Sequence, residues 1–206
     1  MFRWSEVMDH FRKMRRYIAF GFVLFFAGVV VGGTNPSFEQ FIEGQIEGLR
    51  QIATTVERTP NPALSMFVII FLNNAIKSIM VMYLGVFFGL FPLMFLIVNG
   101  MVIGYFINHM ATTQGWGFAA ETIAKGILPH GIIEIPAIII ASAYGLKFGT
   151  LALRLLGAAI TRNGPAVLRE TEVFVKRTVP LMVWLVVSLL AAAVIETTLS
   201  RWLLTL

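Results

Sequence analysis

The chain has 206 residues, of which 57% are hydrophobic and only 13% are charged, and its mean hydropathy is +0.80. Soluble domains average about 25% charged residues, so this chain cannot cover an ordinary soluble globule with polar side chains. The low charge also excludes a disordered chain. The lack of cysteine excludes disulfides, thiolate nucleophiles and cysteine-ligated metals. The net charge of +5 fits the basic flanks of membrane spans and does not indicate a nucleic-acid partner.

Five segments are apolar enough to cross a bilayer, which takes about 20 helical residues. The first, 17–33, is continuously apolar. The stretch 78–120 holds 43 residues without a formal charge, too many for one span. Gly89 and Pro92 break it, which predicts a tight hairpin of two spans. The predicted spans are 17–33, 66–88, 92–110, 127–146 and 179–195.

The segments between the spans have helical patterns of their own. Apolar residues recur at three- and four-residue steps over 37–59, and a similar pattern over 151–175 breaks at Asn163-Gly164-Pro165. Both are expected to be amphipathic helices that lie on the bilayer or dock a partner. The stretch 112–125 is expected to be a short interfacial or re-entrant element. The predicted fold is therefore an all-α polytopic membrane bundle in a single domain, 1–206.

The distribution of lysine and arginine predicts the orientation. The N-terminal segment and the connection between the fourth and fifth spans carry 11 basic residues, and the opposite side carries 4. Basic residues concentrate at the cytoplasmic surface. We therefore expect a multi-pass cell-membrane protein with a cytoplasmic N-terminus and an external C-terminus.

Polar side chains inside the spans are costly in lipid, so each needs a partner or a function. They occur in three spans: Asn73, Asn74, Lys77, Asn99, Asn108, His109, His130 and Glu134. His130 and Glu134 are four residues apart and share one helix face. At 1.5 Å per residue, Glu134 and the two adjacent asparagines of the second span lie about 10–12 Å below the outer surface. We expect one polar cluster, which Lys77 can reach.

We predict that His130 and Glu134 bind a divalent metal, with zinc as the best fit. An imidazole and a carboxylate one turn apart can converge on one ion. The ion would offset the cost of an ionised carboxylate at this depth. Two side chains do not complete a tetrahedral site, so Asn73 or Asn74, His109, water or a dimer mate is expected to complete it. The asparagines can instead act as partners that orient His130.

A metal-free network is the alternative to this site. In that arrangement Lys77 pairs with Glu134, or a protonated Glu134 bonds to an asparagine. The polar residues then only satisfy one another and fix the packing of the bundle.

Three motifs carry a family resemblance: Phe71-Leu72-Asn73-Asn74, Asn99-Gly100-xxx-Gly104 and Pro129-His130-Gly131-x-x-Glu134, the last continued by 135–145. Together they resemble the stage II sporulation protein M family, strongly over 66–149 and loosely over the five-span layout. The resemblance implies an integral membrane protein without enzymatic activity. Its sporulation member resembles a scaffold that holds the peptidoglycan-degrading stage II sporulation proteins D and P at the division septum. Cell-wall hydrolases are therefore the partners that the resemblance implies.

Other functions compete with this non-enzymatic scaffold. A transporter or permease subunit would use Lys77, His130 and Glu134 to line a pathway, which is the default meaning of ionisable groups in a membrane. An intramembrane metallohydrolase is disfavoured, because the H-E-x-x-H pattern of zincins does not occur.

Gly100 and Gly104 form a pair of small residues that allows close contact between helices. The pair predicts a homodimer if it faces a second copy. If it packs within one chain, it has no such role.

The predicted orientation can be tested by cysteine labelling, because the chain has no native cysteine. A cysteine replacing Gln45 should react with an impermeant maleimide added outside the cell, and one replacing Glu170 should be shielded. The reverse pattern of labelling would overturn the orientation.

Overall fold

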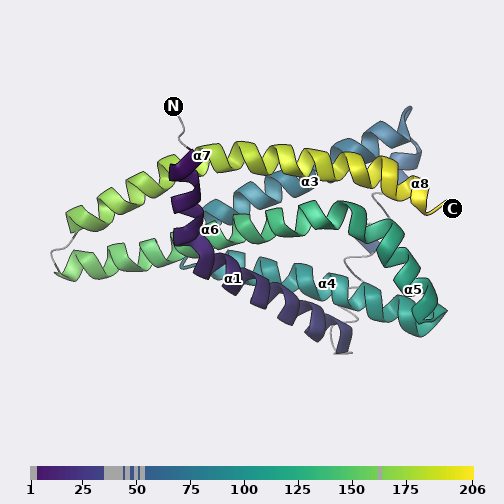
Figure 1. Cartoon of the computed structure of the whole chain (residues 1–206), viewed down its shortest axis with the longest axis horizontal. Coiled ribbons are helices and arrows are strands. Elements are labelled where there is room, and N and C mark those ends of the chain that lie inside the picture. Colours follow the sequence, from purple (N-terminus) through teal and green to yellow (C-terminus); the bar gives the residue numbers. More distant parts are fainter. Residues whose placement is uncertain (1–3, 35–43, 45–46, 49–50, 52–53, 162–163) are drawn as a thin grey trace.

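The computed structural model describes residues 4–34, 44, 47–48, 51, 54–161 and 164–206. These residues form helices, with no strand among them, which confirms the all-α prediction. Figure 1 shows an elongated bundle in which α6 and α7 run side by side along its length. The elements are α1 (Trp4–Thr34), α3 (Pro62–Leu84), α4 (Leu90–Gln114), α5 (Trp116–Thr122), the π-helix η2 (Ile123–Ile127), α6 (Leu128–Thr161), α7 (Gly164–Ile195), the π-helix η3 (Glu196–Ser200) and α8 (Arg201–Leu203).

Five segments of these helices are long and apolar enough to cross a membrane: Arg12–Thr34, Pro62–Leu84, Leu90–Gln114, Trp116–Ala158 and Gly164–Leu203. Their outward faces are apolar, with Val23 65% exposed and Val183 and Met94 each 62% exposed. Exposed apolar surface of this extent needs lipid to cover it. The protein is therefore a multi-pass membrane protein, and each predicted span falls on one of these segments.

Helices α1 and α4 run parallel and touch backbone to backbone through glycines of both helices. A Cβ at Gly100 would overlap the carbonyl oxygen of Phe25, and one at Gly104 would overlap that of Val29. In the other direction, a Cβ at Gly32 would overlap the backbone of Met101. The Gly100–Gly104 pair is thus occupied within the chain and offers no face to a second copy. A homodimer, if formed, must use another surface.

A second glycine contact anchors the turn between α3 and α4. Phe88 and Gly89 adopt left-handed φ values of 58° and 78°, which reverses the chain where the sequence predicts a hairpin. This turn lies against α6, where a Cβ at Gly145 would lie 2.7 Å from the carbonyl oxygen of Val81 and one at Gly149 would overlap Gly89. Because only glycine allows this approach, the turn is held at one height on α6.

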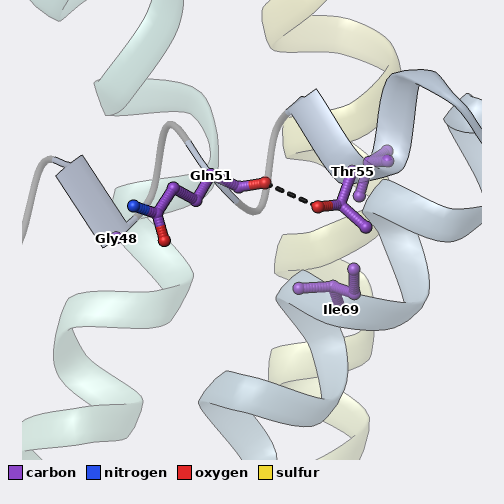
Figure 2. Close-up of a pocket in the computed structure, with 5 residues that line it drawn as sticks. Gly48, Gln51, Thr55 and Ile69 are labelled. Carbon is purple, nitrogen blue, oxygen red and sulfur yellow. Dashed lines mark hydrogen bonds between the residues drawn. The ribbon is translucent and has the colours of Figure 1, made fainter.

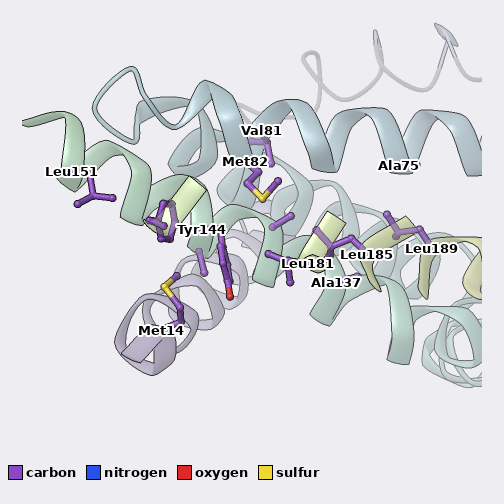
Figure 3. Packing of buried hydrophobic residues seen from close by; sticks show 13 residues of the cluster. Met14, Ala75, Val81, Met82, Ala137, Tyr144, Leu151, Leu181, Leu185 and Leu189 are labelled. Carbon is purple, nitrogen blue, oxygen red and sulfur yellow. The ribbon is translucent and has the colours of Figure 1, made fainter. Parts of the chain in front are cut away.

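Side chains from four helices fill the core between these contacts, and Figure 3 shows this cluster. Tyr144 of α6 is 1% exposed and stacks on Phe174 of α7, with ring centroids 5.6 Å apart. Met14, near the start of α1, belongs to the same cluster. The Tyr17 hydroxyl lies 3.0 Å from the Thr150 hydroxyl. These contacts hold the beginning of α1 across α6, as Figure 1 shows.

The segment 151–175 does not form separate interfacial helices as predicted. α6 has 34 residues and α7 has 32, so they measure about 51 and 48 Å, well beyond a bilayer core of about 30 Å. Pro136 and Pro180 lie inside these helices without ending them. In Figure 1 the end of α6 and the start of α7 project past the other helices as a hairpin. Its two helices are joined by ion pairs from Glu170 to Lys147, at 3.0 Å, and to Arg154, at 2.6 Å.

The two remaining connections can be followed in part. The predicted amphipathic helix at 37–59 falls largely outside the described residues, although Gly44, 47–48, Gln51 and 54–57 are helical. The stretch 112–125, predicted to be a short interfacial or re-entrant element, is helical for most of its length. It contains the end of α4, a bend at Gly115 with φ of 92°, and then α5 and η2, which lead directly into α6.

Replacing Gly104 tests the contact between α1 and α4. We expect Gly104→Val to lower the melting temperature in detergent by roughly 4–10 °C, because overpacking costs about 1–3 kcal/mol. Gly157→Val is the matched control, since Gly157 is exposed and a Cβ there meets no atom within 4 Å. Equal effects of the two substitutions on the melting temperature would contradict the proposed role of this contact.

Candidate functional site

Three chain segments far apart in the sequence meet at one end of the bundle. α6 and α7 are antiparallel, so the beginning of α6 lies beside η3 at the end of α7. α3 runs parallel to α6 and also contacts η3. This end is opposite the α6–α7 hairpin, because His130 lies 20 residues before Thr150, or about 30 Å along α6. Under the predicted orientation it is the outer end.

An amide–carboxylate hydrogen bond joins α3 to α6 at this end. Asn74 Nδ2 donates to Glu134 Oε1 at 2.9 Å. Asn73 Nδ2 donates in turn to Asn74 Oδ1 at 3.3 Å. The predicted link between the asparagine pair and the fourth span therefore exists. Because Asn74 donates through its amide nitrogen, it orients the carboxylate of Glu134.

His130 and Glu134 are joined by a third ionisable residue from the other helix. One ligand atom each from His130, Glu134 and Glu196 lie within 4.8 Å of one another. The hydroxyl of Ser200, which is 3% exposed, lies 3.4 Å from His130 Nδ1. The site thus collects one imidazole and two carboxylates, which are ligand types that zinc and other divalent transition metals accept.

Both helices depart from α-helical geometry where they supply this site. η2 ends directly before α6, and η3 contains Glu196 and Ser200. Pro129 has no amide hydrogen to donate to the preceding turn, so a regular α-helical ladder cannot run unbroken into α6. η2 and η3 contact each other. Single π-helical turns are frequent at functional sites.

Lys77 does not join the cluster as predicted. No ion pair between Lys77 and Glu134 occurs, and Lys77 is exposed on the outer face of α3, with Asn73 one turn before it. Asn74 is half-buried and points to α6. Successive residues of a helix are about 100° apart. Because of this angle, Asn73 lies on the outer face of α3, whereas Asn74 faces α6.

The polar residues predicted in the third span also lie apart from the cluster. Asn99 bonds to the carbonyl of Phe95 in its own helix, at 2.7 Å. Asn108 and His109 are exposed, and the His109 ring stacks on Tyr105 at 5.5 Å between centroids. His109 is not among the clustered ligand groups of the described residues.

Glu196 is the residue that sequence reasoning missed, because its place just beyond the fifth span suggests that water solvates it. One signal was present. With five spans, the beginning of the fourth and the end of the fifth fall on the same side of the membrane. His130 and Glu196 are therefore expected at similar depth, and antiparallel packing of those two spans then brings them together.

Figure 2 shows a separate hollow on the surface of the protein. It is open and lined by Gly48, Gln51, Thr55, Val56 and Ile69. Its one hydrogen bond in the figure joins the Thr55 hydroxyl to the Gln51 carbonyl at 2.8 Å. None of the clustered polar residues lines it, so the polar cluster remains the candidate site.

The fold and the polar cluster define a polytopic helical membrane protein with an ionisable site at one end of its bundle. Residues 18–201 match the family model for stage II sporulation protein M. This match covers nearly the whole chain, and the chain belongs to the stage II sporulation protein M family.

Two relatives are uncharacterised proteins of Methanocaldococcus jannaschii. The first is 27% identical over 124 residues, which are 60% of this chain and 52% of the relative. The second is 38% identical over 77 residues, which are 37% of this chain and 42% of the relative. The chain therefore spans about half the length of these relatives. No solved structure matches the chain.

The two asparagines provide a test of the hydrogen bond to Glu134. We expect Asn74→Ala to lower the melting temperature by roughly 3–8 °C, because a hydrogen bond to a charged group contributes about 1.5–3 kcal/mol. Asn73→Ala is the control and should change the melting temperature far less, since Asn73 is exposed and does not contact Glu134. Equal shifts for both variants would rule out a special role of Asn74.

Proposed function

We propose that the protein is a non-enzymatic membrane scaffold that binds the transmembrane helix of a membrane-anchored partner along the outer face of α3. The observation that supports this proposal is the exposure of Asn73 and Lys77 on that face. A lysine inside a span costs about 2.5–3.5 kcal/mol on insertion scales when it faces lipid. A partner that covers this face would remove that cost.

The outer face of α3 combines polar and apolar groups in one row. Leu72, Ile76 and Met80 are 45%, 50% and 52% exposed and flank the two polar residues. Interhelical hydrogen bonds and close packing drive association in lipid. The expected occupant is therefore an apolar helix with a carboxylate or amide that meets Lys77.

The family supplies the expected class of partner. Stage II sporulation protein M is the family to which the chain belongs, and the resemblance implies enzymes that remodel the cell wall. Under the predicted orientation, a partner anchored by one helix at α3 would carry its catalytic domain outside the cell, where the wall lies. The scaffold would then position this domain without taking part in the chemistry.

Transport is the alternative function, and the polar cluster is the observation that supports this alternative. Glu134 and Glu196 are ionisable groups in the span segments, and such groups often mark a pathway for ions or substrates. Under this alternative the protein would be a permease subunit. The scaffold is favoured because Lys77 and Asn73 face outward from the bundle and do not line its interior.

Photo-crosslinking in cells tests the scaffold. A photoreactive amino acid replacing Ile76 should give a crosslink to a membrane-anchored wall hydrolase, and adding Lys77→Leu should weaken that crosslink severalfold. A photoreactive residue replacing Val187 is the matched control, because Val187 is similarly exposed, at 58%, but belongs to α7. It should give no such crosslink.

Two outcomes would contradict the scaffold. If Ile76 crosslinks only to lipid with or without Lys77→Leu, the lysine reaches the membrane surface by itself and no partner covers α3. If the purified protein supports substrate flux in liposomes and no hydrolase is captured, transport is the function. A crosslinked product of twice the chain mass would instead show that a second copy covers α3, in agreement with the predicted homodimer.

A further inference from the structure

We propose that His130, Glu134 and Glu196 together bind one divalent metal ion, with zinc as the preferred ion. The proposed site differs from the one expected from the sequence, because Glu196 of η3 takes the place of the asparagines as the third ligand. It is independent of the scaffold function, since none of its three residues lies on the outer face of α3.

The distances between the three ligand groups suit one small ion. Ligands bound to zinc at about 2.0–2.2 Å in a tetrahedron lie roughly 3.4 Å from one another. The three ligand atoms are already within 4.8 Å of one another. Side-chain rotations that move the ligand atoms by about 1 Å therefore bring these atoms to bonding distance, without movement of the helices. His130 and Glu134 come from one face of α6, and Glu196 approaches from the opposite helix.

The charges at this position call for a cation. Glu134 and Glu196 face each other where α6 and α7 meet, and repulsion between two carboxylates is strong where little water screens it. Among the described residues, no lysine or arginine forms an ion pair with either carboxylate. Lys125 of η2, the nearest lysine to His130 along the chain, is paired with Glu121 at 2.6 Å. A divalent ion carries the charge that balances two carboxylates, and a neutral imidazole adds a ligand without adding charge.

Neighbouring polar groups orient two of the proposed ligands. Asn74 holds Glu134 through Oε1 at 2.9 Å, which leaves Oε2 for the ion. The Ser200 hydroxyl lies beside His130 Nδ1, at 3.4 Å, which leaves Nε2 for the ion. Metal-binding histidines and carboxylates commonly have such partners, which fix the side chain before the ion binds.

The backbone gives a second and independent indication. η2 precedes His130, and η3 carries both Glu196 and Ser200. Each π-helical turn shifts the following residues relative to a regular α-helix, so the side chains of the two helices are re-aimed at this level and nowhere else in the described parts of α6 and α7. Such turns recur at functional sites.

The ligand set also narrows the choice of ion. Magnesium and calcium prefer sites made of oxygen atoms alone, whereas imidazole favours zinc and its neighbours among the transition metals. With three protein ligands, zinc keeps a fourth position for water or for a group of a bound molecule. The proposed site would thus keep one coordination position free of protein ligands.

The experiment begins with the full chain purified in detergent without chelator. We expect elemental analysis to find about one zinc ion per chain. After the metal is removed with a chelator, adding zinc at about 100 times its dissociation constant should raise the melting temperature by roughly 5–10 °C. Magnesium added at the same concentration should not.

Three variants locate the ion. Glu196→Gln and Glu134→Gln should each lower zinc affinity at least tenfold, and Asn74→Ala should lower it less. Glu121→Gln is the matched control, because Glu121 is an exposed glutamate near the same end of the bundle. The control should bind zinc like the unmodified chain.

The proposal fails if the unmodified chain binds no stoichiometric zinc and its melting temperature does not respond to chelator or added zinc. The two carboxylates would then share a proton in a metal-free network. It also fails if Glu196→Gln binds zinc as tightly as the unmodified chain. Zinc binding by the unmodified chain is measured directly. This measurement decides the proposal even if a variant does not fold. Neither outcome depends on the crosslink at Ile76, so failure here is distinct from failure of the scaffold.

Discussion

The arrangement of this protein depends on backbone-to-backbone contact at glycines. Lipid is as apolar as the side chains of the spans, so burial of apolar surface gives little drive for helices to associate, and close packing must supply it. Gly100 and Gly104 let α4 press against the backbone of α1. Gly145 and Gly149 let the α3–α4 turn press against α6. The first contact joins α1 to α4. The second sets the position of the α3–α4 hairpin along the axis of α6.

The position of the α3–α4 hairpin along α6 decides which residues of α6 the polar side chains of α3 contact. α3 runs parallel to α6 from this anchor, and the register brings Asn74 level with Glu134, at 2.9 Å. The antiparallel return of α7 brings Glu196 and Ser200 to the same level. A shift of one turn, about 5.4 Å, would separate all of these groups. The candidate site therefore depends on contacts at Gly145 and Gly149, which lie about 17 and 23 Å from Glu134 along α6.

The polar residues of the spans fall into two groups with different meanings. Glu134, His130 and Glu196 turn toward one another between helices. Asn73 and Lys77 face outward from α3. The first group is where we propose an ion, and the second is where we propose a neighbouring helix. This division supports a metal site and a docking face as separate features of one small bundle.

The sequence by itself determined the class of protein, the approximate spans, the hairpin at Gly89 and the similar depth of the Asn73–Asn74 pair and Glu134. These follow from local properties: apolar length, glycine and proline positions, and helix periodicity. Only the tertiary structure decided that Lys77 points away from Glu134, that Gly100 and Gly104 pack within the chain, that α6 and α7 extend as one hairpin and that Glu196 completes the cluster. The physical reason is that helix rotation and register are set by contacts between segments far apart in the chain, which no local pattern encodes.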